Sequence, residues 1–127
     1  MPTNYLVVRS LLLYDELLGS EFTVEHPTGS GHQHTLREVA TDLADRLIGI
    51  WLPDGTGRRP VAGGQPLLAE DPAWKDNLLF YEYFHGDNGA GLGASHQTGW
   101  TALVVDLLLD PPSRARKVFS RPFPHDE

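Results

Sequence analysis

Three stretches of the chain carry apolar residues at the spacing of helices. The first covers residues 3–18 and is followed by Gly19, which suits a helix C-cap. The second begins at Thr35, where Thr35-Leu36-Arg37-Glu38 fits a capping box. The third runs from about Thr98 to Leu109 and ends before a pair of prolines. The pattern predicts a mainly α-helical chain.

The first and third predicted helices are apolar on nearly every side, whereas the second has a polar face. A helix that is apolar all round is buried in a larger body. A chain of 127 residues buries only about two thirds of its unfolded surface, too little to enclose two such helices. We therefore expect a piece of a larger helical body or an obligate oligomer. A double-layered helical barrel typically alternates helices that are buried on both sides with helices that are exposed to solvent on one side.

The segments between the helices read as loops with short extended pieces. Alternating residues over 22–26 suggest one such piece, and the aromatic-rich stretch Leu78 to His85 suggests another. Glycines then fill Gly86 to Gly93. We expect a single unit over 1–110 and a disordered tail over 111–127, because the tail has little to bury.

Composition excludes several classes of function. The chain is 40% hydrophobic and 21% charged, which is typical of a globular protein. Its net charge of -7 disfavours binding to nucleic acid, and the absence of Cys excludes disulfides and thiolate chemistry. The apolar run 5–18 is too short and too charged to span a membrane, and it lacks the features of a signal peptide. We expect a cytoplasmic protein with no membrane or nucleic-acid partner.

The candidate chemistry lies between Tyr81 and Thr101. Glu82 stands among aromatic residues in a predicted extended segment, where loss of hydration is expected to raise the pKa of its carboxyl group. A carboxyl group of this kind suits a general acid or base. The alternative, an ion-paired Glu in a strand, is equally compatible with the composition.

Two further patterns resemble ligand-binding motifs, but the residues around them argue against that interpretation. Gly89-x-Gly91-x-x-Ala94 superficially matches a dinucleotide fingerprint, but the preceding segment is aromatic and no acidic residue follows on a second strand. His32-x-His34, with His26 nearby, lacks the acidic residues of a metal site. We expect no cofactor and no metal.

The segment Leu79-Phe80-Tyr81-Glu82-Tyr83-Phe84-His85-Gly86-Asp87-Asn88-Gly89, with His96-Gln97-Thr98-Gly99-Trp100-Thr101, resembles the C-terminal signature of glycoside hydrolase family 63. The likeness is to the bacterial glucosidase-like or mannosylglycerate-hydrolase-like branch and covers roughly residues 2–110. It implies an (α/α)6 barrel that hydrolyses α-glycosidic bonds with inversion, using one carboxyl group as acid and another as base.

The resemblance also implies roles for individual residues. Glu82 matches the general base, and Trp100, Tyr81, His96 and Gln97 fall where residues that contact sugar are expected. The Asp that acts as general acid, and a Trp-Arg-Gly-Pro-type motif, precede the matching region in the family and are absent here. We therefore expect a C-terminal fragment of a glycosidase that takes an oligosaccharide or small glycoside and is inactive alone. It would work with the missing part of the barrel or by self-association. The alternative is a non-catalytic carbohydrate-binding or oligomerising remnant.

Overall fold

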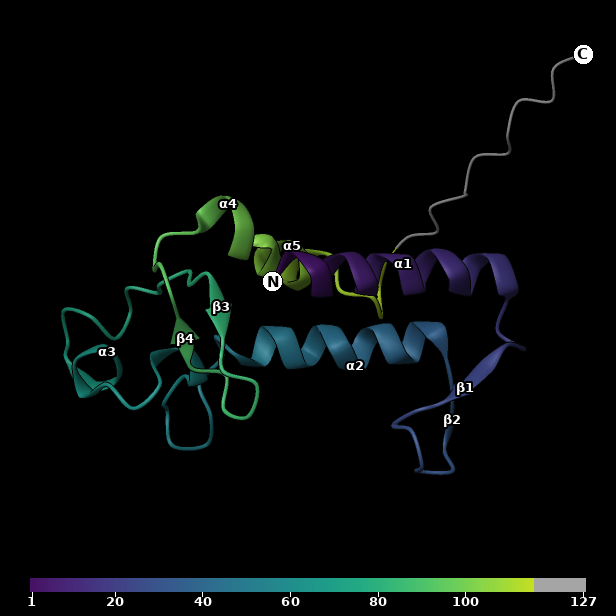
Figure 1. Ribbon diagram of the computed structural model, residues 1–127, viewed down its shortest axis with the longest axis horizontal. Coiled ribbons are helices and arrows are strands. Elements are labelled where there is room, and N and C mark those ends of the chain that lie inside the picture. The colour runs from purple at the N-terminus through teal and green to yellow at the C-terminus, as the bar shows by residue number, and fades with distance from the viewer. Residues whose placement is uncertain (116–127) are drawn as a thin grey trace, which may run out of the picture.

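A computed structural model of the protein describes residues 1–115. It is mainly helical, as predicted, and two helices form its long axis. Figure 1 shows them side by side and running in opposite directions, joined at one end by a hairpin. The elements of this half are α1 (Pro2–Leu18), β1 (Thr23–Glu25), β2 (Gln33–Thr35) and α2 (Leu36–Gly49).

Local signals in the sequence set the ends of these two helices. Pro2 lies in the first turn of α1, where its missing N–H costs nothing, and Gly19 follows the last residue. At the start of α2 the Thr35 hydroxyl accepts from the Glu38 amide, while the Glu38 carboxylate accepts from the Thr35 amide at 2.7 Å. The predicted C-cap and capping box are both confirmed.

The second half is a lobe beyond the C-terminal end of α2, followed by two short helices, the second of which lies beside α1 (Figure 1). Pro-rich and Gly-rich loops dominate the lobe, and its regular elements are brief. They are η1 (Pro60–Ala62), α3 (Pro66–Glu70), β3 (Tyr83–Phe84) and β4 (Gly91–Leu92), and after them come α4 (Thr98–Thr101) and α5 (Leu103–Leu109).

The helix predicted over 98–109 is interrupted at Ala102. Thr101 is fully buried, and its hydroxyl donates a hydrogen bond to the carbonyl of Tyr81, twenty residues away. The Gln97 amide donates to the Phe80 carbonyl at 2.8 Å. These bonds hold α4 against the segment that precedes β3. The direction of α4 is therefore set by that distant segment rather than by continuation into α5.

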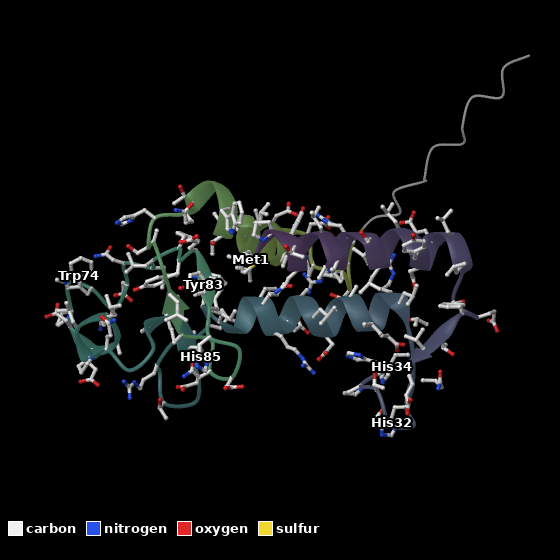
Figure 2. All side chains as sticks on the ribbon, in the orientation of Figure 1. Met1, His32, His34, Trp74, Tyr83 and His85 are labelled. Atoms are coloured by element: carbon white, nitrogen blue, oxygen red, sulfur yellow. The ribbon has the colours of Figure 1, made fainter. Side chains whose placement is uncertain are left out.

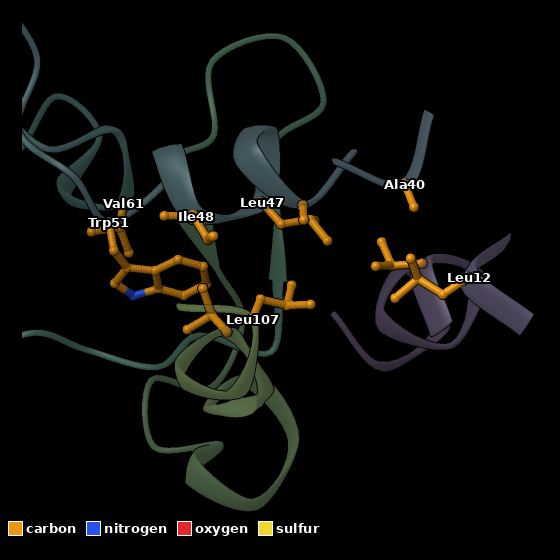
Figure 3. Packing of buried hydrophobic residues seen from close by; sticks show 10 residues of the cluster. Leu12, Ala40, Leu47, Ile48, Trp51, Val61 and Leu107 are labelled. Carbon is orange, nitrogen blue, oxygen red and sulfur yellow. The ribbon is translucent and has the colours of Figure 1, made fainter. Parts of the chain in front are cut away.

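The core lies where α2, α1 and α5 meet. Figure 3 shows Leu47, Ile48 and Trp51, from α2 and the turn after it, packed beside Leu107 of α5. Leu107 has no exposed surface, and Val8 supplies an equally buried side chain from α1. Fully burying an aliphatic side chain of this kind stabilises the fold by roughly 1.5–3 kcal/mol.

The chain beyond α5 packs against α2 for a few residues. Pro112 is fully buried, and its carbonyl accepts a 2.8 Å hydrogen bond from the Arg37 guanidinium. Arg37 also pairs with Asp15 of α1 at 3.1 Å, so one side chain joins three segments. Most of the predicted disordered tail, residues 116–127, lies outside the described residues.

Apolar side chains remain exposed on one side of α1 and α5. Leu6 and Leu17 of α1 are 63% and 65% exposed, and Leu109 of α5 is 81% exposed. Residues 1–115 thus leave uncovered part of the surface that the sequence predicts to be buried. Over this range no helix is both long enough and apolar enough to cross a membrane.

Candidate functional site

Of the predicted extended segment Leu78 to His85, only Tyr83–Phe84 forms a strand, and it pairs with β4 in the glycine-rich segment that follows. Tyr83 lies opposite Leu92, and Phe84 lies opposite Gly91, in an antiparallel register. The Glu82 amide donates to the Ala94 carbonyl at 2.8 Å, and a single bridge joins Phe80 to His96. The two stretches 80–85 and 90–97 therefore lie side by side.

Glycines let these two stretches come this close. A Cβ atom on Gly91 would overlap the ring of Tyr81. Gly93 has a φ of 75°, and a Cβ there would lie 2.7 Å from the Tyr83 ring and 2.8 Å from the Glu82 carboxylate. Because both groups lie within 3 Å of the position that a Gly93 Cβ atom would take, the Glu82 carboxylate and the edge of the Tyr83 ring are neighbours.

Glu82, the predicted general base, lies on the surface in the part of the chain that the structure describes. One carboxylate oxygen accepts a long, 3.4 Å hydrogen bond from the Ala94 amide. The enclosure by aromatic rings that the sequence suggests is not provided by residues 1–115. The carboxylate is open to water and to any further protein or ligand.

The four predicted sugar-contacting residues lie close in sequence to β3, β4 and α4, but none is in either strand. Tyr81 is half-buried under Gly91, and Gln97 caps α4 through its backbone. His96 is exposed, and Trp100 on α4 is 51% exposed. The backbone bonds of Phe80 and Tyr81 to α4 fix these residues in one unit with Glu82. Within residues 1–115, however, the structure records no side-chain contact between Glu82 and these four.

Trp51 of the core packs against the segment that contains Glu82. Its ring lies edge-on to Phe84 with centroids 5.0 Å apart, and it is tilted against Phe80 at 6.3 Å. Its indole N–H donates to the Leu79 carbonyl at 3.3 Å. Trp51, just after the end of α2, thereby fixes the position of residues 79–84, which include Glu82.

A cleft of about 520 Å³ opens beside β3, and the sequence gives no local signal for it. Tyr83, His85 and Asn88 form one wall, and the ends of α1 and α2 form the other with Asn4 and Arg46. Figure 2 shows Tyr83 and His85 where the lobe meets the end of α2, with Met1 close above. None of the five predicted site residues lines this cleft.

The histidine-rich hairpin binds α2. His26 lies 2.9 Å from Asp42, and Arg46 also contacts Asp42, at 3.0 Å. The hydrogen bond with His26, and then the contact with Arg46, lowers the pKa of Asp42. His34 stands edge-on to His26 and near Glu38, while His32 is exposed. Among residues 1–115 no group of three His, Asp or Glu side chains is arranged to hold a metal ion.

Comparison with known proteins finds two similar chains, both from Saccharomyces cerevisiae. The chain is 45% identical over 111 residues, 86% of its length, to the uncharacterized protein YMR196W, of which it spans about a tenth. A shorter stretch of 35 residues, 28% of the chain, is 49% identical to a mannosyl-oligosaccharide glucosidase and covers 4% of that protein. No protein-family model and no solved structure matches. The chain is thus similar to a small part of a much longer protein, with a local likeness to a glucosidase.

Proposed function

We propose that residues 1–110 form the C-terminal portion of an (α/α)6 catalytic domain of glycoside hydrolase family 63, and that Glu82 is its general base. The local likeness to a mannosyl-oligosaccharide glucosidase is the observation that carries the proposal. The exposed position of Glu82, directly before β3 and bonded through its amide to the Ala94 carbonyl, supports it. The domain would be mainly helical, in keeping with the helices seen here.

In the proposed reaction the Glu82 carboxylate takes a proton from the hydrolytic water. That water attacks the sugar from the face opposite the leaving group, which inverts the configuration. Tyr81, His96, Gln97 and Trp100 would contact the sugar. The acid that protonates the leaving oxygen would come from another part of the barrel, because its position precedes the matching region. Without that acid the chain loses a contribution typically worth 10²–10⁴-fold in rate.

The uncovered apolar sides of α1 and α5 support the need for further protein. Leu6, Leu17 and Leu109 are more than half exposed, and each would gain from burial against other helices. In the proposal these sides face the rest of the barrel. The likeness to a relative roughly ten times longer is compatible with this arrangement.

Coexpression tests the proposal. The chain is produced with a longer segment that supplies the missing part of the barrel, and hydrolysis of an α-glucoside, glucosylglycerate and mannosylglycerate is measured. Activity should appear only when both parts are present. Glu82→Gln should lower kcat at least about a hundredfold, whereas Glu70→Gln, at another exposed glutamate, should leave kcat unchanged. Activity that survives Glu82→Gln contradicts the role of Glu82.

A second candidate is a carbohydrate-binding or oligomerising remnant without catalysis. The same exposed leucines favour it, because two copies could cover one another through α1 and α5. Size-exclusion chromatography with light scattering separates the two candidates. A stable oligomer that binds oligosaccharide without turnover supports the remnant, and a partner-dependent activity supports the glycosidase.

A further inference from the structure

Two consecutive arginines of the lobe line a pocket that the proposed function does not use. Three loops supply this pocket: the loop after α2, the loop after η1, and the turn between β3 and β4. Its volume of about 380 Å³ lies within the range of ordinary ligand sites. We call it the arginine pocket and define it by Asp54, Arg58, Arg59, Gly63, Gly64 and Asn88.

The two arginines differ from those of the long helices in their partners. Each arginine of α1 and α2 pairs with an aspartate, at 2.6 to 3.1 Å. Within residues 1–115 the structure records no such ion pair for Arg58 or Arg59, although the chain has 17 acidic residues against 10 basic ones. One nitrogen of Arg59 donates to the Trp51 carbonyl, which anchors the side chain and leaves its other N–H groups to donate. An acidic chain thus keeps two guanidinium groups available in one place.

Two further hydrogen-bond donors belong to the same pocket. The side-chain oxygen of Asn88 accepts from the Ala90 amide at 3.0 Å, which leaves the NH₂ group of Asn88 to donate. Gly64 is exposed, and in the described part of the chain no hydrogen bond from its amide is recorded. A Cβ atom on Gly64 would meet nothing within 4 Å, so a ligand can approach this stretch of backbone. Apart from Asp54, the polar side chains of the walls offer donors, which favours a ligand rich in acceptor atoms.

Asp54 is the one carboxylate that lines the pocket among residues 1–115, and its charge is already engaged. One of its oxygens accepts from the Thr56 hydroxyl at 2.7 Å, the Thr56 amide at 2.8 Å and the Arg58 amide at 3.1 Å. The bonds from Thr56, and then the Arg58 amide and guanidinium, lower the pKa of Asp54. The carboxylate therefore holds the loop that carries Arg58. With two guanidinium groups and one carboxylate, the pocket keeps a net positive charge.

We infer that the arginine pocket binds a phosphate group, either as the free inorganic ion or as a phosphate monoester. A guanidinium presents parallel N–H donors that match two phosphate oxygens. A phosphate group carries about 1.5 to 2 negative charges near pH 7 and several acceptor oxygens, so it can meet Arg58, Arg59 and the Asn88 amide together. The inference goes beyond the proposed function, because it stands on this pocket alone and does not require Glu82 to be a base.

The test is a titration of the 127-residue chain with inorganic phosphate at constant ionic strength, followed by amide NMR. Shifts should saturate below about 10 mM and should be concentrated at Arg59, Gly63 and Gly64. Arg58→Gln should weaken binding at least about fivefold. Arg114→Gln is the matched control, because Arg114 is also exposed but does not line the pocket, and it should keep the affinity within about twofold.

Asp54→Asn gives a prediction of opposite sign. The variant keeps an oxygen that accepts from the loop amides but loses the negative charge, so phosphate should bind about twofold to threefold more tightly. Exchange of the Arg58 amide shows whether the loop stays closed. Weaker binding by an Asp54→Asn chain whose loop is closed contradicts the inference. If Arg58→Gln loses its circular-dichroism signal, Arg58→Lys replaces it and should weaken binding about threefold, because Lys keeps the charge without the planar donors.

Other anions separate the possible ligands. Ethyl phosphate, a simple monoester, should bind about as well as inorganic phosphate if the pocket takes esters, and clearly less well if the free ion is the ligand. Acetate, which represents a carboxylate, should bind at least about fivefold more weakly than phosphate. Absence of saturable shifts with phosphate, equal affinity for acetate, or equal weakening by Arg114→Gln overturns the inference.

Discussion

The hydroxyl of Tyr5 and the carboxylate of Asp106, 101 positions apart in the chain, form a hydrogen bond of 2.6 Å that joins α1 to α5. Arg9 contacts the same carboxylate oxygen at 2.6 Å and the Tyr5 hydroxyl at 3.0 Å. Three side chains thus close one network at the junction of the two helices. The hydrogen bond from Tyr5, and then Arg9, lowers the pKa of Asp106.

Removing the charge of Asp106 should loosen this junction. Asp106→Asn is expected to destabilise the chain by roughly 1 kcal/mol, because a partly exposed, charge-assisted bond contributes only modestly. Asp45→Asn, on an exposed position of α2, is the control and should change little. Urea unfolding measures both. Equal midpoints for the two variants contradict the role of the network.

The same network predicts a dependence of stability on pH. Because the pKa of Asp106 is lower in the folded chain than in the unfolded one, its contribution is complete above the ordinary Asp pKa of about 4. It is lost as pH falls through the lowered value. Wild type and Asp106→Asn should therefore converge in stability as the pH falls below the ordinary Asp pKa of about 4, which urea unfolding at several pH values checks. If the difference in unfolding free energy between wild type and Asp106→Asn stays the same in acid, the carboxylate of Asp106 is not the source of the stabilisation.

The capping box at the start of α2 gives a second stability prediction. Thr35→Ala leaves the Glu38 amide without its hydroxyl partner and should cost about 1 kcal/mol. Thr28→Ala, at an exposed loop position, serves as the comparison. Thermal unfolding should show a lower midpoint for Thr35→Ala, and matching midpoints would argue that the cap contributes nothing.

Two glycines of the candidate site should respond very differently to the same substitution. Gly91→Ala places a methyl group inside the Tyr81 ring and should separate the two strands, at a cost of roughly 3 kcal/mol. At Gly86 a Cβ meets nothing within 4 Å, so Gly86→Ala should be nearly neutral. Hydrogen exchange of the Glu82 amide, bonded to Ala94, reports the separation directly. Comparable exchange in both variants contradicts the packing seen here.

The hairpin is expected to be held to α2 by Asp42. Asp42→Asn weakens the contacts to His26 and Arg46, both partly exposed, and should destabilise the chain by less than about 1 kcal/mol. The effect should instead appear as faster amide exchange in β1 and β2. Asp45→Asn, three positions further along the same helix, should leave that exchange unchanged.

The parts of the fold that sequence reasoning predicted are those specified by neighbours in the chain. The Thr35–Glu38 box and Gly19 act within one helical turn, so the ends of α1 and α2 could be placed correctly. The break at Ala102 could not, because it depends on the bond from Thr101 to Tyr81. The residues around Ala102 carry no local signal for this break, because the partner of Thr101 lies twenty residues earlier in the chain.

In the candidate site, too, the parts specified by neighbours in the chain were predicted and the parts formed by distant segments were not. The extended segment that contains β3 was predicted in part, because its aromatic residues identify it locally. The cleft lined by Tyr83 was not predicted, because Asn4 and Arg46, which also line it, come from helices that meet Tyr83 only in the folded chain. The expected enclosure of Glu82 is absent from residues 1–115, where Phe80 and Phe84 pack against Trp51 rather than around the carboxylate.

The uncovered leucines of α1 and α5 make the melting temperature of this chain a function of its surroundings. By mass action, whatever binds these helices in the folded state and ignores the unfolded one shifts the equilibrium toward folding in proportion to the logarithm of its concentration. Dilution of the isolated chain should accordingly lower the midpoint, while saturating amounts of a covering partner should raise it to a plateau.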